Sequence, residues 1–171
     1  MPKLVPRLFD GPIPKGKKLR RQVELNLNDN PPADAVIALT DVYTGKPDFT
    51  GAEDAKRKMK EWVGAEEKFH PHAALHEFEA WLLPYWDAVK RLSGSDRTAP
   101  PGSPERVNHA KPPSRWLQET FRTGKRMNYS KTRDAARILD GQDLSIAARA
   151  CPELKALLNT ILTLCGGAPL N

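Results

Sequence analysis

The segment KFHPHAALHEFEAWLLPYW, residues 68–86, concentrates the side chains that could do chemistry. It holds three of the four histidines of the chain, together with Glu77 and Glu79. A run of large apolar residues follows these polar groups directly. Burying an unpaired polar or charged group costs roughly several kcal/mol, so such a segment is either a satisfied hydrogen-bond network or a functional site.

The residues around His72 and His76 argue against one metal chemistry. A zinc protease of the HExxH type needs two histidines four residues apart on one helix, with a glutamate between them as the general base. His72 and His76 have this separation, but they enclose Ala-Ala-Leu, and Pro71 argues against a long helix through His72. The chain also lacks the GxxxxGK[ST] frame of a nucleotide-binding P-loop.

A site for a hard cation is more consistent with these residues. Magnesium is held by oxygen ligands, commonly one or two carboxylates completed by water and phosphate. We expect Asp41 and Glu79 to be the metal ligands, with Glu77 as a second candidate. If the segment is helical from residue 76, the two glutamates diverge, and His76 shares a face with Glu79. In the alternative interpretation Glu79 makes a buried hydrogen bond and Glu77 is solvated.

The elements that would position these residues follow from the hydrophobic pattern. Residues 34–45 form a near-continuous apolar run of strand length, typical of a strand covered on both faces. Residues 51–64 have an amphipathic helical pattern, and residues 68–75 are expected to form a second strand. Asp41 stands at the carboxyl end of the first strand, the edge where open α/β sheets bind their ligands.

The remaining chain is expected to be mostly helical. Residues 1–14 read as an edge strand or extended segment, and residues 15–28 as an amphipathic helix. A further helix begins near residue 76 and is kinked by Pro84. After a Pro-rich loop or lid, the expected helices start at Ser114 and Asp134 and cover residues 144–150 and 152–164. We therefore predict an α/β core (1–95), a loop (96–114) and a helical part (115–171) of the same domain.

Composition sets the remaining bounds. The 171 residues suit one domain, and the net charge of +6 gives weak support for a polyanionic partner such as nucleic acid. Basic residues gather in segments 15–21 and 122–133, with Trp116 and Tyr129 as stacking groups, although two solvated faces would look the same. The two cysteines lack metal-ligand spacing, and no apolar run reaches membrane-spanning length, so a reduced cytoplasmic protein is expected.

Two segments carry a family resemblance. ALTDVYTGKPDFTG and FHPHAALHEFEAWLL resemble the bacterial proteins grouped as domain of unknown function 4276, over roughly residues 5–165. That family is similar to Toprim domains, the metal-dependent α/β fold of topoisomerases, primases and related nucleases. The matched positions are Asp41, Tyr43, Asp48, Phe49 and Gly51, followed by His76, Glu77, Phe78, Glu79 and Ala80. Family members usually carry a first-strand Val-Glu-Gly, which this sequence lacks, and the Toprim Asp-x-Asp reads Asp41-Val42-Tyr43 here.

The resemblance implies a small Toprim-like sheet with a helical C-terminal half, acting on phosphodiester bonds with Mg or Mn in an anti-phage defence module. The expected catalytic residues are Asp41, His76, Glu77 and Glu79. The expected substrate-binding residues are Tyr43, His72, Lys17, Lys18, Arg20, Lys125 and Arg126. The alternative is a non-catalytic module that docks on an ABC-type ATPase or on nucleic acid. A homo-oligomer is compatible with either function, because the apolar face of the last helix could be core or an oligomer contact.

Overall fold

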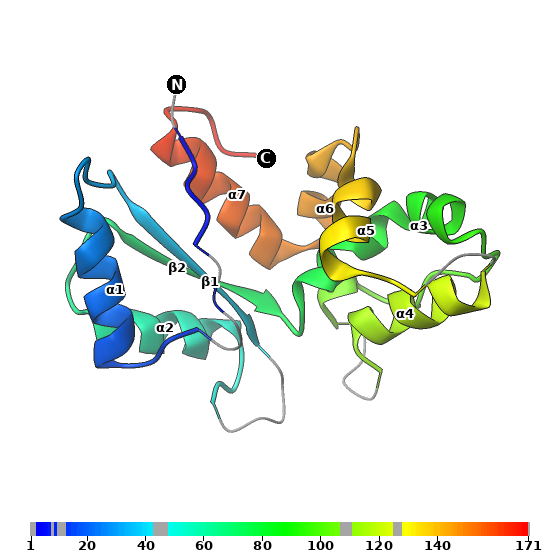
Figure 1. Ribbon diagram of the computed structural model, residues 1–171, viewed down its shortest axis with the longest axis horizontal. Coiled ribbons are helices and arrows are strands. Elements are labelled where there is room, and N and C mark those ends of the chain that lie inside the picture. The colour runs from blue at the N-terminus through cyan, green and yellow to red at the C-terminus, as the bar shows by residue number, and fades with distance from the viewer. Residues whose placement is uncertain are drawn as a thin grey trace.

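A strand–helix–strand unit forms the sheet layer of the protein. The structure is a computed structural model that describes residues 3–7, 9, 13–42, 48–106, 111–124 and 128–170. Strand β1 (Val36–Val42) is followed by helix α2 (Ala52–Val63) and strand β2 (Phe69–Leu75), and the two strands pair in parallel. Their register aligns Val36 with Phe69 and Val42 with Leu75, so both strands end at the same edge (Figure 1).

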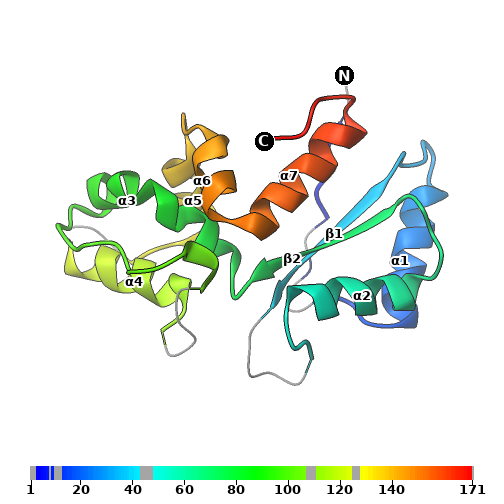
Figure 2. The same ribbon diagram turned by 180° about the vertical axis from the view of Figure 1, so that it is seen from behind.

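Helices cover both faces of this small sheet. Helix α1 (Lys17–Leu27) packs against α2, and together with one face of the strands they enclose the first hydrophobic cluster. Helix α7 (Pro152–Leu164) packs on β2 from the other face (Figures 1 and 2). This two-sided cover explains the continuous apolar run of β2, whereas Leu39 in the middle of β1 is 41 % exposed.

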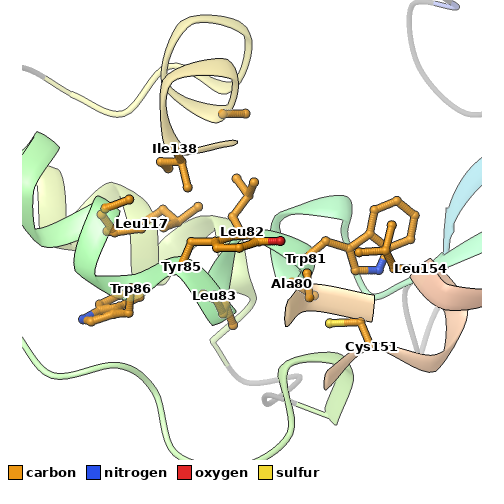
Figure 3. Packing of buried hydrophobic residues seen from close by; sticks show 14 of the residues in the cluster. Ala80, Trp81, Leu82, Leu83, Tyr85, Trp86, Leu117, Ile138, Cys151 and Leu154 are labelled. Carbon is orange, nitrogen blue, oxygen red and sulfur yellow. The ribbon is translucent and has the colours of Figure 1, made fainter. Parts of the chain in front are cut away.

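The helical half has its own core. After β2 the chain forms the 3₁₀ helix η1 (Phe78–Tyr85), α3 (Trp86–Ser93), the short 3₁₀ helix η2 (Pro104–Arg106), α4 (Pro113–Thr123), α5 (Lys131–Leu139) and α6 (Leu144–Ala150). Side chains of η1 lie at the centre, where Leu82 packs with Leu117 and Ile138, while Trp81 lies beside Cys151 and Leu154 (Figure 3). Segment 78–85 is therefore both the core of this half and the direct continuation of the sheet edge.

Several sequence predictions are confirmed. The fold is mixed α/β, both strands and the helices at 15–28, 51–64, 144–150 and 152–164 are present, and Pro152 opens α7. None of the helices within the described ranges is long and apolar enough to cross a membrane.

Other predictions were wrong in detail. Residues 3–7, 9, 13 and 14 have no regular secondary structure, which fits the extended alternative for segment 1–14 and not the edge strand, and the described part of the sheet has two strands. No α-helix begins at residue 76, because His76 has a left-handed backbone with φ 70°, and a 3₁₀ helix starts at Phe78 instead. Helix α5 starts at Lys131 rather than at Asp134. The N-cap residue Ser130 donates its N–H to the Asp134 carboxylate (2.7 Å), and this contact across the first turn stabilises the earlier start.

Candidate functional site

The candidate site is the acidic edge, which we define as Asp41, Glu77 and Glu79 with the cation Lys131. Asp41 lies one residue before the end of β1. The chain leaving β2 returns to the same place, because His76 N–H donates to the Val42 carbonyl at 2.9 Å. Two residues later, Phe78 N–H donates to Asp41 Oδ1 at 3.2 Å. The parallel strand pair thus brings segment 76–79 against the Asp41 carboxylate.

Lys131 joins the two carboxylates from the far end of the sequence. Its Nζ lies 3.7 Å from Asp41 Oδ2 and 3.5 Å from Glu79 Oε2. The same ammonium lies 4.5 Å from the centroid of the Phe78 ring, a cation–π contact that supports this position. Lys131 is the first residue of α5, so the positive end of that helix also faces the acidic edge.

Glu77 has a different partner. Both of its carboxylate oxygens accept hydrogen bonds from Ser114, one from the backbone N–H (2.8 Å) and one from the hydroxyl (2.9 Å). Ser114 is the second residue of α4, so the carboxylate satisfies one of the open N–H groups at this helix start. The two glutamates have different partners, since Glu77 binds Ser114 and Glu79 lies beside Lys131. Both side chains are buried, so Glu77 is not the solvated residue of the alternative interpretation.

Burial governs the electrostatics of the acidic edge. The Glu79 side chain is only 3 % exposed, and its Oε2 has no hydrogen-bond partner. Burial raises the pKa of Glu79 to about 7, and the nearby Lys131 charge only partly offsets this shift. Burial also raises the pKa of Asp41, again opposed by Lys131. Among the described residues, Lys131 is the cation that pairs with both carboxylates, and its charge does not fully offset the effect of burial on either pKa.

Tyr129 borders the same region. Its ring packs edge-on against Phe121, with centroids 5.6 Å apart, and its buried hydroxyl has no hydrogen-bond partner. Burial raises the Tyr129 pKa, and the negative charge of Glu79 is the next cause. The ring belongs to the helical core, so it does not form the exposed stacking group that the sequence suggested. Trp116 is likewise occupied, with Lys111 Nζ 4.1 Å from its ring centroid.

His72 and His70 lie elsewhere on β2. Both line a hollow of about 520 Å³ between α2 and α7, together with Thr160, Lys56 and Lys60. His72 Nε2 lies 3.0 Å from Thr160 Oγ1. Burial lowers the pKa of His72 to about 4, so this imidazole is neutral near pH 7. His72 was expected among the substrate-binding residues, and it contacts Thr160 of α7 rather than the acidic edge.

The described basic residues that were expected to bind substrate do not lie at the acidic edge. Lys17, Lys18 and Arg20 are exposed on α1, where Arg20 pairs with Glu24 at 2.8 Å. Tyr43, Lys125 and Arg126 lie outside the described residues. Among the described residues of segment 122–133, Lys131 is the one that reaches the acidic edge. Sequence reasoning singled out neither Lys131 nor Ser114; the only signal was the general basic character of that segment.

The carboxylates of the acidic edge suit a magnesium-like ion only if the protein supplies few of its ligands. No cluster of three or more His, Cys, Asp or Glu side chains with metal-binding geometry occurs in the described ranges. Asp41 and Glu79 supply two carboxylates, and Glu79 Oε2 is a buried oxygen without a hydrogen-bond donor. Magnesium is often held by one or two carboxylates with water and substrate phosphate, so the residues present fit that class and not an all-protein cage.

Comparison with known proteins gives the family of the chain. The sequence model of a domain of unknown function, number 4276, matches residues 4–162, so the chain belongs to that family. No curated protein and no solved structure matches it.

Proposed function

We propose that this family member hydrolyses phosphodiester bonds of nucleic acid with a magnesium or manganese ion held at the acidic edge. The observation that carries the proposal is the convergence of Asp41 and Glu79 on one ammonium at the carboxyl edge of a parallel strand pair. This edge is where α/β sheets place their ligands. Burial raises the pKa of both carboxylates, and a divalent cation bound between them would favour their charged forms.

Each residue has a role in this proposal. Asp41 and Glu79 would hold the ion, which supplies Lewis-acid stabilisation of charge on the phosphoryl oxygens. Lys131 would contact a non-bridging phosphate oxygen, since its ammonium is half-exposed and already lies at this edge. Glu77 fixes the start of α4 through Ser114 and thereby shapes the wall of the site. His76, buried at the turn between the two carboxylate-bearing segments, orients the chain that carries Glu79.

The test is cleavage of single-stranded and double-stranded DNA and of RNA by the purified chain. Magnesium, manganese and chelator conditions should be compared for the wild type, Asp41→Asn and Glu79→Gln. The matched control is Asp87→Asn, which removes one exposed carboxylate from α3. We expect divalent-dependent cleavage that is lost in the first two variants and retained in the control, while the circular dichroism spectra of all three variants match that of the wild type. Full cleavage by both site variants would reject the assignment.

A second candidate is a non-catalytic docking module, and one feature specifically favours it. Lys131 already pairs with both carboxylates, while the two oxygens of Glu77 are occupied by Ser114. Such a closed network can simply hold the sheet against the helical half. In that case an ABC-type ATPase subunit or a nucleic acid would be the partner, and the defence role suggested by the family resemblance would be carried by the complex.

The two candidates predict different results in cells. If the chain is an enzyme, Asp41→Asn should abolish protection in a phage plaque assay while co-purification with a neighbouring ATPase persists. If it is a docking module, protection and co-purification should both survive Asp41→Asn.

A further inference from the structure

Helix α1 carries a share of the net charge that is out of proportion to its length. Its 11 residues include four cations and one acid, Glu24, so the helix has a net charge of +3 in a chain whose net charge is +6. Glu24 pairs with Arg20 at 2.8 Å, and one carboxylate cannot neutralise the other three cations as well. All four cations are exposed. We call this surface the cationic face and define it as Lys17, Lys18, Arg20 and Arg21.

The neighbouring helix α2 handles its charge differently. It also has four cations, but three acids accompany them on the same helix. Arg57 and Lys58 both pair with Asp54. Lys56 pairs with Glu53 in the same way. Helix α2 therefore neutralises most of its charge internally, as a solvated helix commonly does, whereas α1 presents its positive charge at the surface of the protein.

The cations of α1 also stand where the helix itself disfavours them. The start of a helix carries a partial positive charge, so acids stabilise it and cations destabilise it. The first turn of α1 contains no acid, and its N-cap residue Gly16 has no side chain to cap the helix. Helix α2 follows the favourable pattern, with Glu53 and Asp54 in its first turn. The positive charge of α1 thus costs stability, and a bound polyanion would offset this cost.

The burial of the apolar residues of α1 favours nucleic acid over a membrane as the polyanion. A helix that lies on a membrane places its apolar side among the lipids. In α1 that side is already used, because Leu19 and Val23 are 3 % and 2 % exposed and belong to the hydrophobic cluster shared with α2. Nucleic acid needs no apolar insertion, since lysine and arginine bind its phosphates directly.

The cationic face lies away from the acidic edge. Figures 1 and 2 both show α1 at one end of the molecule, helices α3 to α6 at the other end, and the strands between them. Both strands end toward the helical half, where the acidic edge meets the first turns of α4 and α5. Helix α1 can therefore contribute affinity for a long ligand, but it cannot take part in chemistry at the acidic edge.

We propose that the cationic face binds the phosphate backbone of nucleic acid, as a contact area separate from the acidic edge. The inference rests on the proposed function for the identity of the polyanion, but the binding itself requires neither a metal ion nor cleavage. Phosphate contacts position a nucleic acid without reading its bases, so the face should raise the affinity for any sequence. Because the contacts are ionic, they should weaken steeply as the salt concentration rises.

The test is the binding of a fluorescently labelled DNA duplex, measured by anisotropy over a series of salt concentrations in the presence of EDTA. The variant combines Lys17→Gln, Lys18→Gln and Arg21→Gln, which keep a good helix former at each position. We expect an affinity loss of at least about tenfold at about 0.1 M salt. The slope of log K against log salt should fall by roughly two to three, because each lost phosphate contact removes about 0.9.

A matched control separates a local surface from net charge. It removes three exposed cations from α3, α4 and α6 of the helical half, so its charge change is the same. The control substitutions are Arg91→Gln, Arg122→Gln and Arg149→Gln. We expect the control to bind DNA within about twofold of the wild type. Thermal unfolding should show that the α1 variant is no less stable than the wild type, since its substitutions remove cations from a helix start.

Three results would overturn the proposal. The first is no binding of DNA by the wild type, and the second is an equal loss of affinity in the α1 variant and the control. The third is unchanged DNA binding by an α1 variant that no longer sediments with anionic lipid vesicles, which would assign the face to a membrane. Failure of the proposed function is a separate result, because it appears as absent cleavage with magnesium or manganese while the binding measured in EDTA is retained.

Discussion

Glu77 binds Ser114 through both of its carboxylate oxygens, at 2.8 Å and 2.9 Å. The two residues are far apart in the sequence: Glu77 lies just after β2, and Ser114 lies in the first turn of α4. The contact joins the sheet edge to the helical half and sets a carboxylate against the positive end of a helix. Because Glu77 is 7 % exposed, little water can replace its bonds.

Substitution of Glu77 should therefore cost stability. Glu77→Ala leaves the Ser114 N–H and hydroxyl without their acceptor, and we expect a loss of about 2 kcal/mol in the free energy of unfolding. Glu77→Gln retains one acceptor oxygen and should lose roughly half as much. Urea unfolding of both variants, with Ser114→Ala in a double-mutant cycle, measures the pairwise contribution. Simple additivity of Glu77→Ala and Ser114→Ala would contradict the contact.

Glu79 should make the protein less stable as the pH rises. The folded chain holds the Glu79 proton up to a pKa of about 7, whereas the unfolded chain releases it near 4.5. Between these values the folded state binds more protons, so the free energy of unfolding falls with rising pH, by on the order of 3 kcal/mol. Glu79→Gln removes this titration and should be more stable than the wild type at pH 8 but not at pH 4. Equal pH slopes for the wild type and the variant would show that Glu79 is not shifted.

His72 should act in the opposite direction. Its folded pKa is about 4, against 6.5 for an ordinary histidine, because burial disfavours the charged ring. The unfolded chain takes up the proton first as the pH falls, so stability is lost between 6.5 and 4, again by on the order of 3 kcal/mol. His72→Gln should flatten this part of the stability curve. The matched control is His70→Gln, which removes a histidine from the same strand and leaves the His72–Thr160 contact in place.

The sequence predicted the sheet layer well because its signals are local. A continuous apolar run, an amphipathic helix and a second apolar run define the strand–helix–strand unit, and the polar break at Asp41 marks its carboxyl edge. The same reasoning failed at His76, where a left-handed residue ends the strand and no pattern in the sequence announces it. Lys131 was missed for a different reason: it lies 52 residues after Glu79, and only the packing of α5 on η1 brings it to the acidic edge.

Lys131 should compete with a divalent cation for the acidic edge. Its ammonium lies 3.7 Å and 3.5 Å from the two carboxylates, which is beyond normal hydrogen-bond length. A metal ion held by the same oxygens would be repelled by this positive charge. We therefore expect Lys131→Met to bind magnesium and manganese about tenfold more tightly than the wild type in isothermal titration, while Lys131→Arg, which keeps the charge, stays close to it. The control is Lys60→Met, in the last turn of α2 and thus at the opposite end of the strands. Weaker binding by Lys131→Met would mean that the ammonium holds the carboxylates in position for the metal, and no binding by any of the four proteins would reject the metal site itself.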